Sequence, residues 1–175
     1  MTKSAMTEIN DLSPETFVER FGFLFEHSPW IVEAAEKSRP FADLDAMHSA
    51  LIQVMLAAGR AAQTALVKAH PRLADKVALA KGLTKESTAE QASVGLDCLT
   101  DAEFEAFHML NTAYDQRFGL PFVICVRLTD KAGILEAMQK RLNHGHDQEL
   151  DTALDEVSKI ARLRLKDAVA RSVAP

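Results

Sequence analysis

Apolar side chains recur at helical spacing along most of the chain. Between about Asp43 and Ala69 they fall on one face at intervals of three and four residues, and Gly59 is the expected point of division. The members of this stripe are Leu44, Met47, Leu51, Val54 and Ala58. We therefore expect two consecutive helices here, with an apolar face directed towards a core.

Helix start signals extend this pattern to other parts of the chain. Ser13-Pro14 and Ser28-Pro29 each place a capping hydroxyl before a proline, an order that favours the first turn of a helix. Ser87-x-x-Glu90 and Thr100-x-x-Glu103 both have the form of a capping box, in which a hydroxyl and a carboxylate satisfy free N–H groups of the first turn. We expect a helix to begin at each of these four signals.

The C-terminal part contains one segment without helical polarity. Residues 122–126 are rich in β-branched and aromatic side chains, so we expect them to be extended. A helix over about Lys131–Leu142 should follow, and a long helix over about Asp147–Val169 should come after a break at Gly145. One extended segment alone cannot form a sheet.

The predicted fold class is therefore all-α. We expect a single-domain bundle of about eight helices over residues 1–175, with one short extended segment near 122–126 and loose termini at 1–12 and 170–175.

Composition narrows the class of protein. A net charge of −5 argues against a surface that binds nucleic acid, and no apolar run approaches the roughly 20 residues of a membrane-spanning helix. The first residues lack the charged-then-apolar order of a secretion signal. Two cysteines, Cys98 and Cys125, are too few for a disulfide framework. We expect a cytoplasmic protein that binds neither nucleic acid nor a membrane.

His70 and Glu90 are the candidate proton-handling residues. Pro71 disfavours a helical conformation at His70, and the partial negative charge at the helix end would favour a protonated imidazole. Glu90 shares a helix face with Ser87 and Gln91. Both candidates also have plainer interpretations, because His70 can cap helix carbonyls and Glu90 can complete a capping box.

Arg164 continues the apolar stripe of the last predicted helix, whereas Arg162 points away from it. That stripe consists of Leu150, Leu154, Val157 and Ala161. A guanidinium on a core-facing stripe needs an anion, which can be a protein carboxylate or a bound one. Asp167 or a glutamate from another helix is the candidate protein partner, and Arg127 is a rival for the same role.

The histidines do not predict a metal site. His144-Gly145-His146 lacks an H-E-x-x-H pattern and a third ligand at a suitable spacing, so we interpret it as an exposed turn. His27, His48 and His108 fall within helical patterns and are expected to be ordinary surface or core-edge residues.

Five motifs occur in a specific order and spacing. They are His70-Pro71 with Leu73 and Lys76, Ser87-x-x-Glu90-Gln91, Leu110-Asn111-x-x-Tyr114, Phe118-Gly119-x-Pro121-Phe122-Val123-Ile124-Cys125, and Glu156-Val157-x-Lys159-Ile160-x-x-x-Arg164-Leu165. Ser28-Pro29-Trp30 and Arg39-Pro40-Phe41 precede them. From about Phe17 to Leu165 the chain resembles the OHCU decarboxylase family, which acts on 2-oxo-4-hydroxy-4-carboxy-5-ureidoimidazoline.

This resemblance implies an all-helical carboxy-lyase without cofactor or metal, usually a homodimer, that forms (S)-allantoin from a ureidoimidazoline in urate degradation. The family's proton-donating histidine matches His70, its essential glutamate matches Glu90, and a recurring arginine matches Arg164. Its substrate-binding segments match Pro71, Ser87, Thr88, Ala89, Glu90, Gln91, Phe122, Val123, Ile124, Cys125 and Val126.

The chemistry of this substrate explains why no cofactor is expected. Its carboxylate sits on a carbon that adjoins a C=N bond, so the electrons released as CO₂ leaves can delocalise into that bond. The protein must orient the carboxylate, stabilise the developing charge and deliver a proton to one face. We expect His70 to deliver the proton and Glu90 to hold the imidazole or a ring N–H in position. Arg164 would neutralise a carboxylate. Ser87, Gln91 and the backbone of residues 122–126 would hold the ureido and ring amides.

Two other functional classes fit parts of the sequence. A non-enzymatic helical binding module with a groove for a partner helix would present an exposed apolar stripe. A metal-dependent hydrolase that uses some of the six histidines would contain stoichiometric metal.

Overall fold

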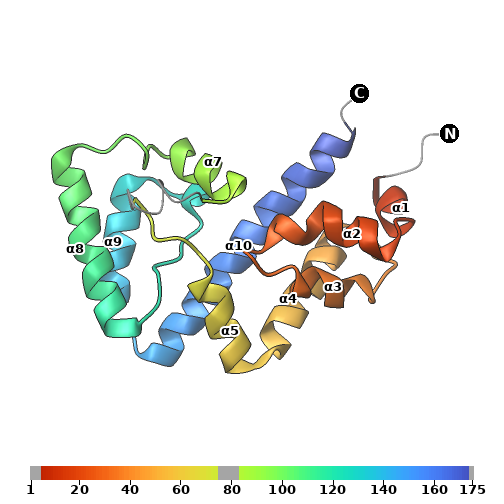
Figure 1. Ribbon diagram of the computed structural model, residues 1–175, viewed down its shortest axis with the longest axis horizontal. Helices are drawn as coiled ribbons and strands as arrows, with labels where there is room; N and C mark the ends of the chain where they lie inside the picture. Colours follow the sequence, from red (N-terminus) through yellow and green to blue (C-terminus); the bar gives the residue numbers. More distant parts are fainter. Residues whose placement is uncertain (1–4, 75–82, 174–175) are drawn as a thin grey trace. The chain divides into compact units, whose positions relative to one another are not determined.

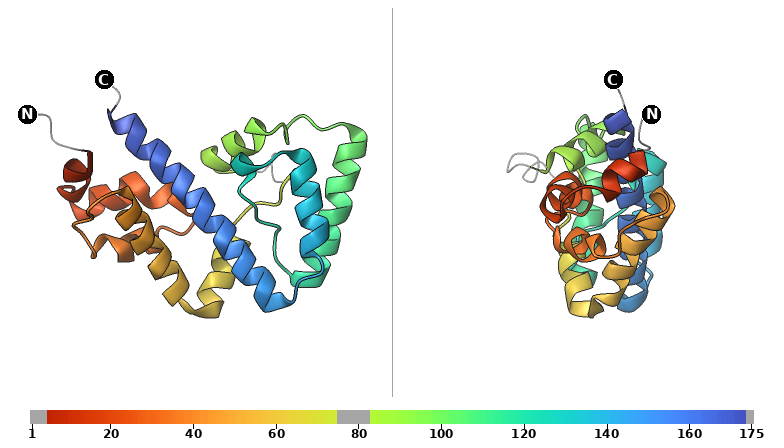
Figure 2. Two further views of the ribbon diagram at one scale, coloured as in Figure 1. Left: turned by 180° about the vertical axis from the view of Figure 1, so that it is seen from behind. Right: turned by 90° about the vertical axis from the view of Figure 1, so that its right-hand side faces the viewer.

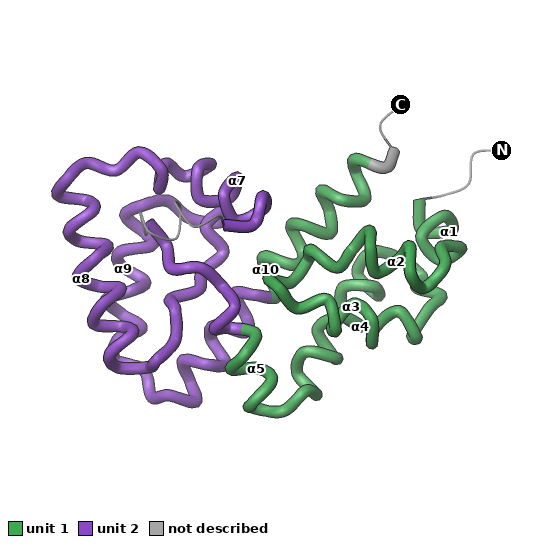
Figure 3. The backbone as a smooth tube through the Cα atoms, in the orientation of Figure 1, with its two compact units in different colours: residues 1–66, 158–175 green, residues 67–157 purple. Residues whose placement is uncertain are grey.

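The computed structural model describes residues 5–74 and 83–173, and these residues form nine α-helices and two short 3₁₀ helices without a strand (Figure 1). The predicted all-α fold class is confirmed. The chain divides into two compact units, residues 1–66 with 158–175 and residues 67–157 (Figure 3). That the chain is a single domain stays a prediction.

Unit 1 contains the N-terminal helices. They are α1 (Ala5–Asn10), α2 (Pro14–Phe21), η1 (Gly22–Leu24), α3 (Trp30–Glu36), α4 (Leu44–Ala57), most of α5 (Gly59–Lys68) and the second part of α10 (His146–Val173). α3 packs against α2 and α4, and each of the three helices carries fully buried side chains, such as Phe17, Ile31 and Met47. Burial of each such side chain stabilises the fold by roughly 1.5–3 kcal/mol.

The first helix is held by one arginine. Arg39 donates hydrogen bonds to the carbonyl oxygens of Leu12 at 2.6 Å and Asn10 at 3.1 Å, and it pairs with Glu36. Its guanidinium also lies 4.9 Å from the centroid of the Phe17 ring. These contacts fix the end of α1, which falls within the stretch expected to be a loose terminus.

The sharp turn between α4 and α5 lies where the sequence places it. Gly59 has a φ of +77°, a conformation that glycine adopts without steric penalty, and the two helices are bent by 112°. Within the described ranges, no single helix is long and apolar enough to cross a membrane, although this bent pair passes the same test of length and composition.

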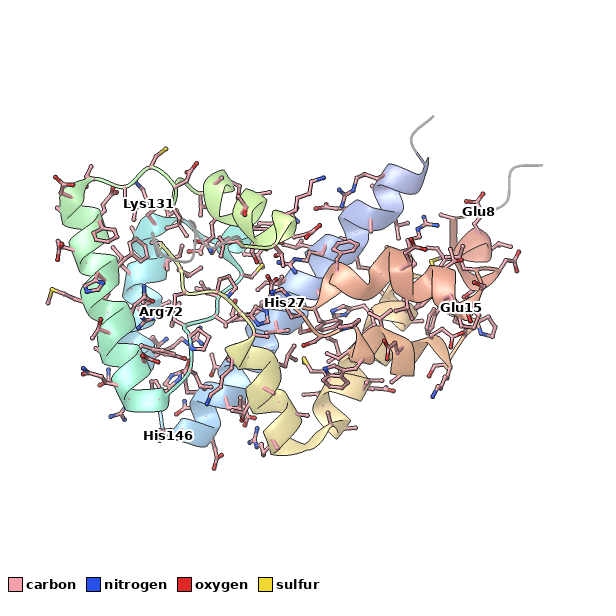
Figure 4. The ribbon with its side chains drawn as sticks, viewed as in Figure 1. Glu8, Glu15, His27, Arg72, Lys131 and His146 are labelled. Atoms are coloured by element: carbon pink, nitrogen blue, oxygen red, sulfur yellow. The ribbon has the colours of Figure 1, made fainter. Side chains whose placement is uncertain are left out.

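Unit 2 contains the remaining elements. They are the end of α5, α7 (Lys85–Ser93), α8 (Asp101–Phe118), η2 (Val126–Leu128), α9 (Lys131–Arg141) and the first part of α10 (Figure 2). α8 packs against α9, with Phe107 and Ile134 fully buried. Lys131 at the start of α9, labelled in Figure 4, forms a 2.6 Å salt bridge with Glu103 of α8.

The start signals are confirmed in part. The Ser13 hydroxyl accepts a hydrogen bond from the Thr16 N–H at 3.2 Å, and Thr100 with Glu103 forms the predicted capping box of α8. α3, in contrast, begins at Trp30 and has no side-chain cap from the Ser28-Pro29 pair.

The expected capping box at Ser87 is wrong. Thr84 is the N-cap of α7, because its hydroxyl accepts the Ser87 N–H at 3.2 Å. Ser87 therefore lies in the first turn, and Glu90 lies in the second turn.

The segment after α8 is the one predicted to be extended. Gly119 has a φ of +62° and ends α8, as the sequence indicates. Residues 121–125 are neither helical nor paired in a sheet, whereas Val126, expected to complete the extended segment, begins η2.

Candidate functional site

His70 lies at the C-terminal end of α5, two residues after Lys68, as predicted. Its N–H donates to the Val67 carbonyl oxygen at 3.1 Å and closes the last turn of the helix, and its side chain is buried. The C-terminal end of a helix carries partial negative charge, and His70 lies at such an end.

The residues after His70 are fastened to α8. Arg72, labelled in Figure 4, donates to the Asn111 carbonyl oxygen at 3.2 Å and lies 3.5 Å from the Asp115 carboxylate. The Leu73 carbonyl oxygen accepts a 2.9 Å hydrogen bond from the Asn111 side chain. A loop that carries a candidate catalytic histidine is thus held at two successive residues.

The same loop is bonded to α7. The Ala74 N–H donates to the side-chain Oε1 of Gln91 at 3.1 Å, and Ala74 adopts a φ of +55°. A positive φ is uncommon for a residue other than glycine, so this turn is specified by its surroundings. The Gln91 amide Nε2 has no acceptor within residues 5–74 and 83–173.

α7 presents part of the predicted site to the interior. Ser87 and Gln91 are buried and Glu90 is half-buried, whereas the side chains of Thr88 and Ala89 are exposed. Ser87, Glu90 and Gln91 therefore form the inward side of the helix, as their spacing predicts.

Residues 122–126 are held from two sides. The Val123 carbonyl oxygen accepts a 2.8 Å hydrogen bond from Arg141, and the Cys125 N–H donates to the Glu156 carboxylate at 2.7 Å. These two backbone groups are not the free groups that the sequence predicts. The N–H groups of Ile124 and Val126 have no acceptor in the part of the chain that the structure describes.

Electrostatics place Glu90 near this segment. Burial raises the pKa of the Cys125 thiol to about 11, and the negative charges of Glu156 and Glu90 contribute to the shift. α7 and η2 also pack against each other. The loop of His70, the helix of Glu90 and residues 122–126 therefore belong to one arrangement within unit 2.

Arg164 has a protein carboxylate as its partner. It is buried on α10 and lies 3.2 Å from the carboxylate of Glu26, and it donates to the Phe23 carbonyl oxygen at 3.2 Å. The partner is a glutamate, but it comes from the turn before α3 and not from a helix. Arg162 points away, as predicted, and pairs with Asp45.

The other candidate residues lie in unit 2, whereas Arg164 belongs to unit 1. Its place in the site stays a prediction. Arg127, the rival arginine, has an exposed side chain in η2.

Two predictions about histidines are correct in part. His144-Gly145-His146 lies at the turn between α9 and α10, where Gly145 and His146 are exposed, but the Nδ1 of His144 lies 2.8 Å from the buried carboxylate of Glu149. His27 is an exposed surface residue, as expected, but it lies in a turn with a φ of +46°, outside any helix. Nowhere in the described ranges do three or more His, Cys, Asp or Glu side chains form a group that could hold a metal ion.

Sequence reasoning missed a buried polar cluster around Glu149. Glu149 is 0% exposed and accepts hydrogen bonds from Tyr114 and Arg141 as well as from His144. The available signal was an acidic residue beside Leu150 at the start of a core-facing helix, because a buried charge requires partners.

Comparisons with known proteins identify the family of the chain. A family model for OHCU decarboxylase matches residues 10–166. A 2-oxo-4-hydroxy-4-carboxy-5-ureidoimidazoline decarboxylase of Haloferax volcanii is 41% identical over 167 residues, which cover 95% of this chain and 97% of the relative. The chain belongs to the OHCU decarboxylase family.

Some proteins that are similar to this chain are longer than it. A uric acid degradation bifunctional protein of Bacillus subtilis is 38% identical over 164 residues, which are 94% of this chain and 32% of that protein. The crystal structure of an (S)-allantoin synthase superposes with a TM-score of 0.75 at 27% identity, and the match covers 93% of this chain and 53% of that chain. The family-level resemblance of the sequence is thereby confirmed.

Proposed function

We propose that the protein decarboxylates 2-oxo-4-hydroxy-4-carboxy-5-ureidoimidazoline to (S)-allantoin in urate degradation, and that His70 delivers the proton to one face. The reaction is supported by family membership and by the activity for which the Haloferax volcanii relative is named. The roles of individual residues are supported by the arrangement within unit 2.

The observation that carries the residue roles is the hydrogen bond between the Ala74 N–H and the Gln91 side chain, 3.1 Å long. It ties the loop of His70 to the helix of Glu90. A general acid and the group that orients it must be held in fixed geometry for proton transfer. A direct bond between their two elements supplies that constraint.

The remaining groups would bind the substrate. Loss of CO₂ leaves an electron pair on the ring carbon, which delocalises into the adjacent C=N bond until His70 protonates that carbon. Gln91 Nε2 and the N–H groups of Ile124 and Val126 are donors for the ureido and ring carbonyl oxygens, and Pro71 and Ser87 would line the same site. Donors that are held before the reaction stabilise developing negative charge without reorganisation.

Arg164 is proposed to neutralise a substrate carboxylate. An arginine carries its N–H donors in a planar fork whose geometry matches a carboxylate, which is the kind of group that the substrate offers.

The test is turnover of substrate generated in situ from urate, with circular dichroism of the product. His70→Asn should lower kcat by roughly 10²–10⁴-fold, the usual contribution of a general acid. His108→Asn is the matched control, because His108 is exposed on α8. A fully active His70→Asn variant, or racemic product from the wild type, would contradict the mechanism.

Two further properties belong to the proposal. The reaction needs no cofactor, so dialysis against EDTA should leave kcat unchanged. The protein is proposed to be a homodimer, so light scattering should give twice the 19.3 kDa mass of the chain.

A further inference from the structure

Glu149 is a buried carboxylate with a complete set of donors. One oxygen accepts hydrogen bonds from the Tyr114 hydroxyl and from two nitrogens of Arg141, with the Nε bond at 2.9 Å. The other oxygen lies 2.8 Å from His144 Nδ1. A buried charge is stable only when it is paired and hydrogen-bonded, and this one is saturated. The Glu149 cluster (Tyr114, Arg141, His144 and Glu149) is therefore a rigid anchor.

Arg141 extends from this anchor to the candidate substrate-binding segment. Its Nη1 donates to the Val123 carbonyl oxygen at 2.8 Å, and its guanidinium lies 4.3 Å from the centroid of the Phe122 ring. The centroid of the Tyr114 ring also lies 5.2 Å from that of Phe122, with an angle of 85° between the two rings. Two successive residues of the segment are thus fixed by one guanidinium.

Cys125, two residues after Val123, is also held through its backbone. Glu156 accepts the Cys125 N–H at 2.7 Å. Ile124 lies between the two fixed residues, and its N–H has no acceptor within the described ranges. The spacing of the two attachments therefore sets where this donor points.

We propose that Arg141, held by the Glu149 cluster, is a positioning residue that aligns residues 122–126 for substrate binding. The inference rests on the proposed function, because it concerns how that site holds its ligand. Arg141 acts through the backbone that it holds and does not itself touch the reacting atoms. Its loss should weaken binding of substrate and product more than it slows the chemical step.

The central experiment compares Arg141→Lys with Arg39→Lys. Lysine keeps the positive charge but lacks the planar fork that reaches a carboxylate and a carbonyl together. Arg39 is the matched control, since it also joins a glutamate, backbone carbonyls and an aromatic ring but holds α1. For each variant, kcat, KM, the Kd of (S)-allantoin by calorimetry and the midpoint of urea unfolding would be measured.

Both variants should lower the urea midpoint, but only Arg141→Lys should raise KM and the allantoin Kd, by roughly tenfold, with kcat within about threefold of the wild type. Hydrogen exchange in a peptide covering 119–128 should also become faster in Arg141→Lys alone. Unchanged KM and Kd in Arg141→Lys, or an equal rise in Arg39→Lys, would overturn the inference.

A second variant covers the case in which Arg141→Lys does not fold. Glu149→Gln keeps an acceptor for Arg141 and removes the counter-charge, and it should raise KM in the same direction. An unchanged KM in this variant would count against the inference. Failure of the proposed function would instead be seen as absence of turnover in the wild type, so the two failures are distinguishable.

Discussion

Asn111 on α8 donates a 2.9 Å hydrogen bond to the carbonyl oxygen of Leu73, three residues after His70. This side chain is buried, and its bond is one of the attachments that hold the His70 loop against α8. Asn111→Ala would leave the Leu73 carbonyl buried without this donor, and we expect the free energy of unfolding to fall by about 1–3 kcal/mol.

Urea unfolding would measure this loss. Thr112→Ala is the control, since Thr112 is the next residue of the same helix and is only half-buried. Equal stability of the Asn111→Ala variant and the control would show that the bond contributes nothing measurable.

Variants of the Glu26–Arg164 pair can distinguish a structural role of Arg164 from a role in substrate binding. Glu26→Ala should destabilise unit 1 by roughly 3–5 kcal/mol, because it removes the buried carboxylate that lies 3.2 Å from the buried Arg164 guanidinium. The double variant Glu26→Leu with Arg164→Met should recover much of this stability. If Arg164 binds the substrate carboxylate, the recovered variant will be folded and strongly impaired in KM, whereas a normal KM would remove Arg164 from the site.

The reactivity of the Cys125 thiol should depend on the charge of Glu90. At pH 8 the exposed Cys98 should react quickly with a thiol reagent, and Cys125 should react slowly because it is buried and its pKa is raised to about 11. In a Cys98→Ser background, Glu90→Gln should increase the Cys125 rate, since it removes one of the negative charges that raise this pKa. Glu86→Gln on the same helix is the control, and equal rates would place Glu90 away from the segment.

His48 should make stability depend on pH. Burial lowers its pKa below the ordinary value, with the charge of Arg162 acting in the same direction and the Ser158 carbonyl and Asp45 opposing it. The unfolded chain therefore binds a proton at a higher pH than the folded chain. Stability should be full above pH 6.5 and should fall as the pH drops towards the folded pKa.

His48→Gln tests this assignment. It can still donate to the Ser158 carbonyl oxygen, which lies 3.0 Å from His48 Nε2, but it does not titrate. The loss of unfolding free energy between pH 7.5 and pH 5.5 should be smaller in the variant than in the wild type. Identical losses would assign the pH dependence to other groups.

Gly133 lies in the first turn of α9, and a Cβ atom there would stand 2.2 Å from the Thr129 hydroxyl oxygen. Gly133→Ala should therefore lower the free energy of unfolding by roughly 1–3 kcal/mol, although alanine is the better helix former. In a Thr129→Ala background the same change should be stabilising by up to about 1 kcal/mol. A stabilising Gly133→Ala in the wild type would contradict the steric explanation.

Local signals in the sequence predict most of the helices. Ser13 and the Thr100–Glu103 capping box are decided by neighbouring backbone groups, and Gly59 and Gly119 mark turns that require a positive φ. The predicted start of α7 at Ser87 is wrong because Thr84, three residues earlier, is the N-cap. Ser87 is buried in the first turn of α7, and the Thr84 hydroxyl caps the helix.

Long-range partners are less visible in the sequence. Periodicity places Arg164 on a buried stripe but does not identify Glu26, because that residue lies in a turn far away in the chain. Glu149 was missed for a similar reason, since Tyr114, Arg141 and His144 come from different elements. A buried charge on an apolar stripe is a detectable signal, whereas the identity of its partner depends on tertiary packing.

The chain passes between its two units inside helices, at residues 66–67 of α5 and at residues 157–158 of α10. Neither crossing is a linker, and each falls among consecutive turns of hydrogen-bonded backbone. Removal of either unit as a fragment would therefore cut both α5 and α10 within the helix. The new helix ends would have no capping residues. An inserted residue at the α10 crossing would rotate everything beyond it by about 100° and would turn the Leu154–Arg164 stripe out of register.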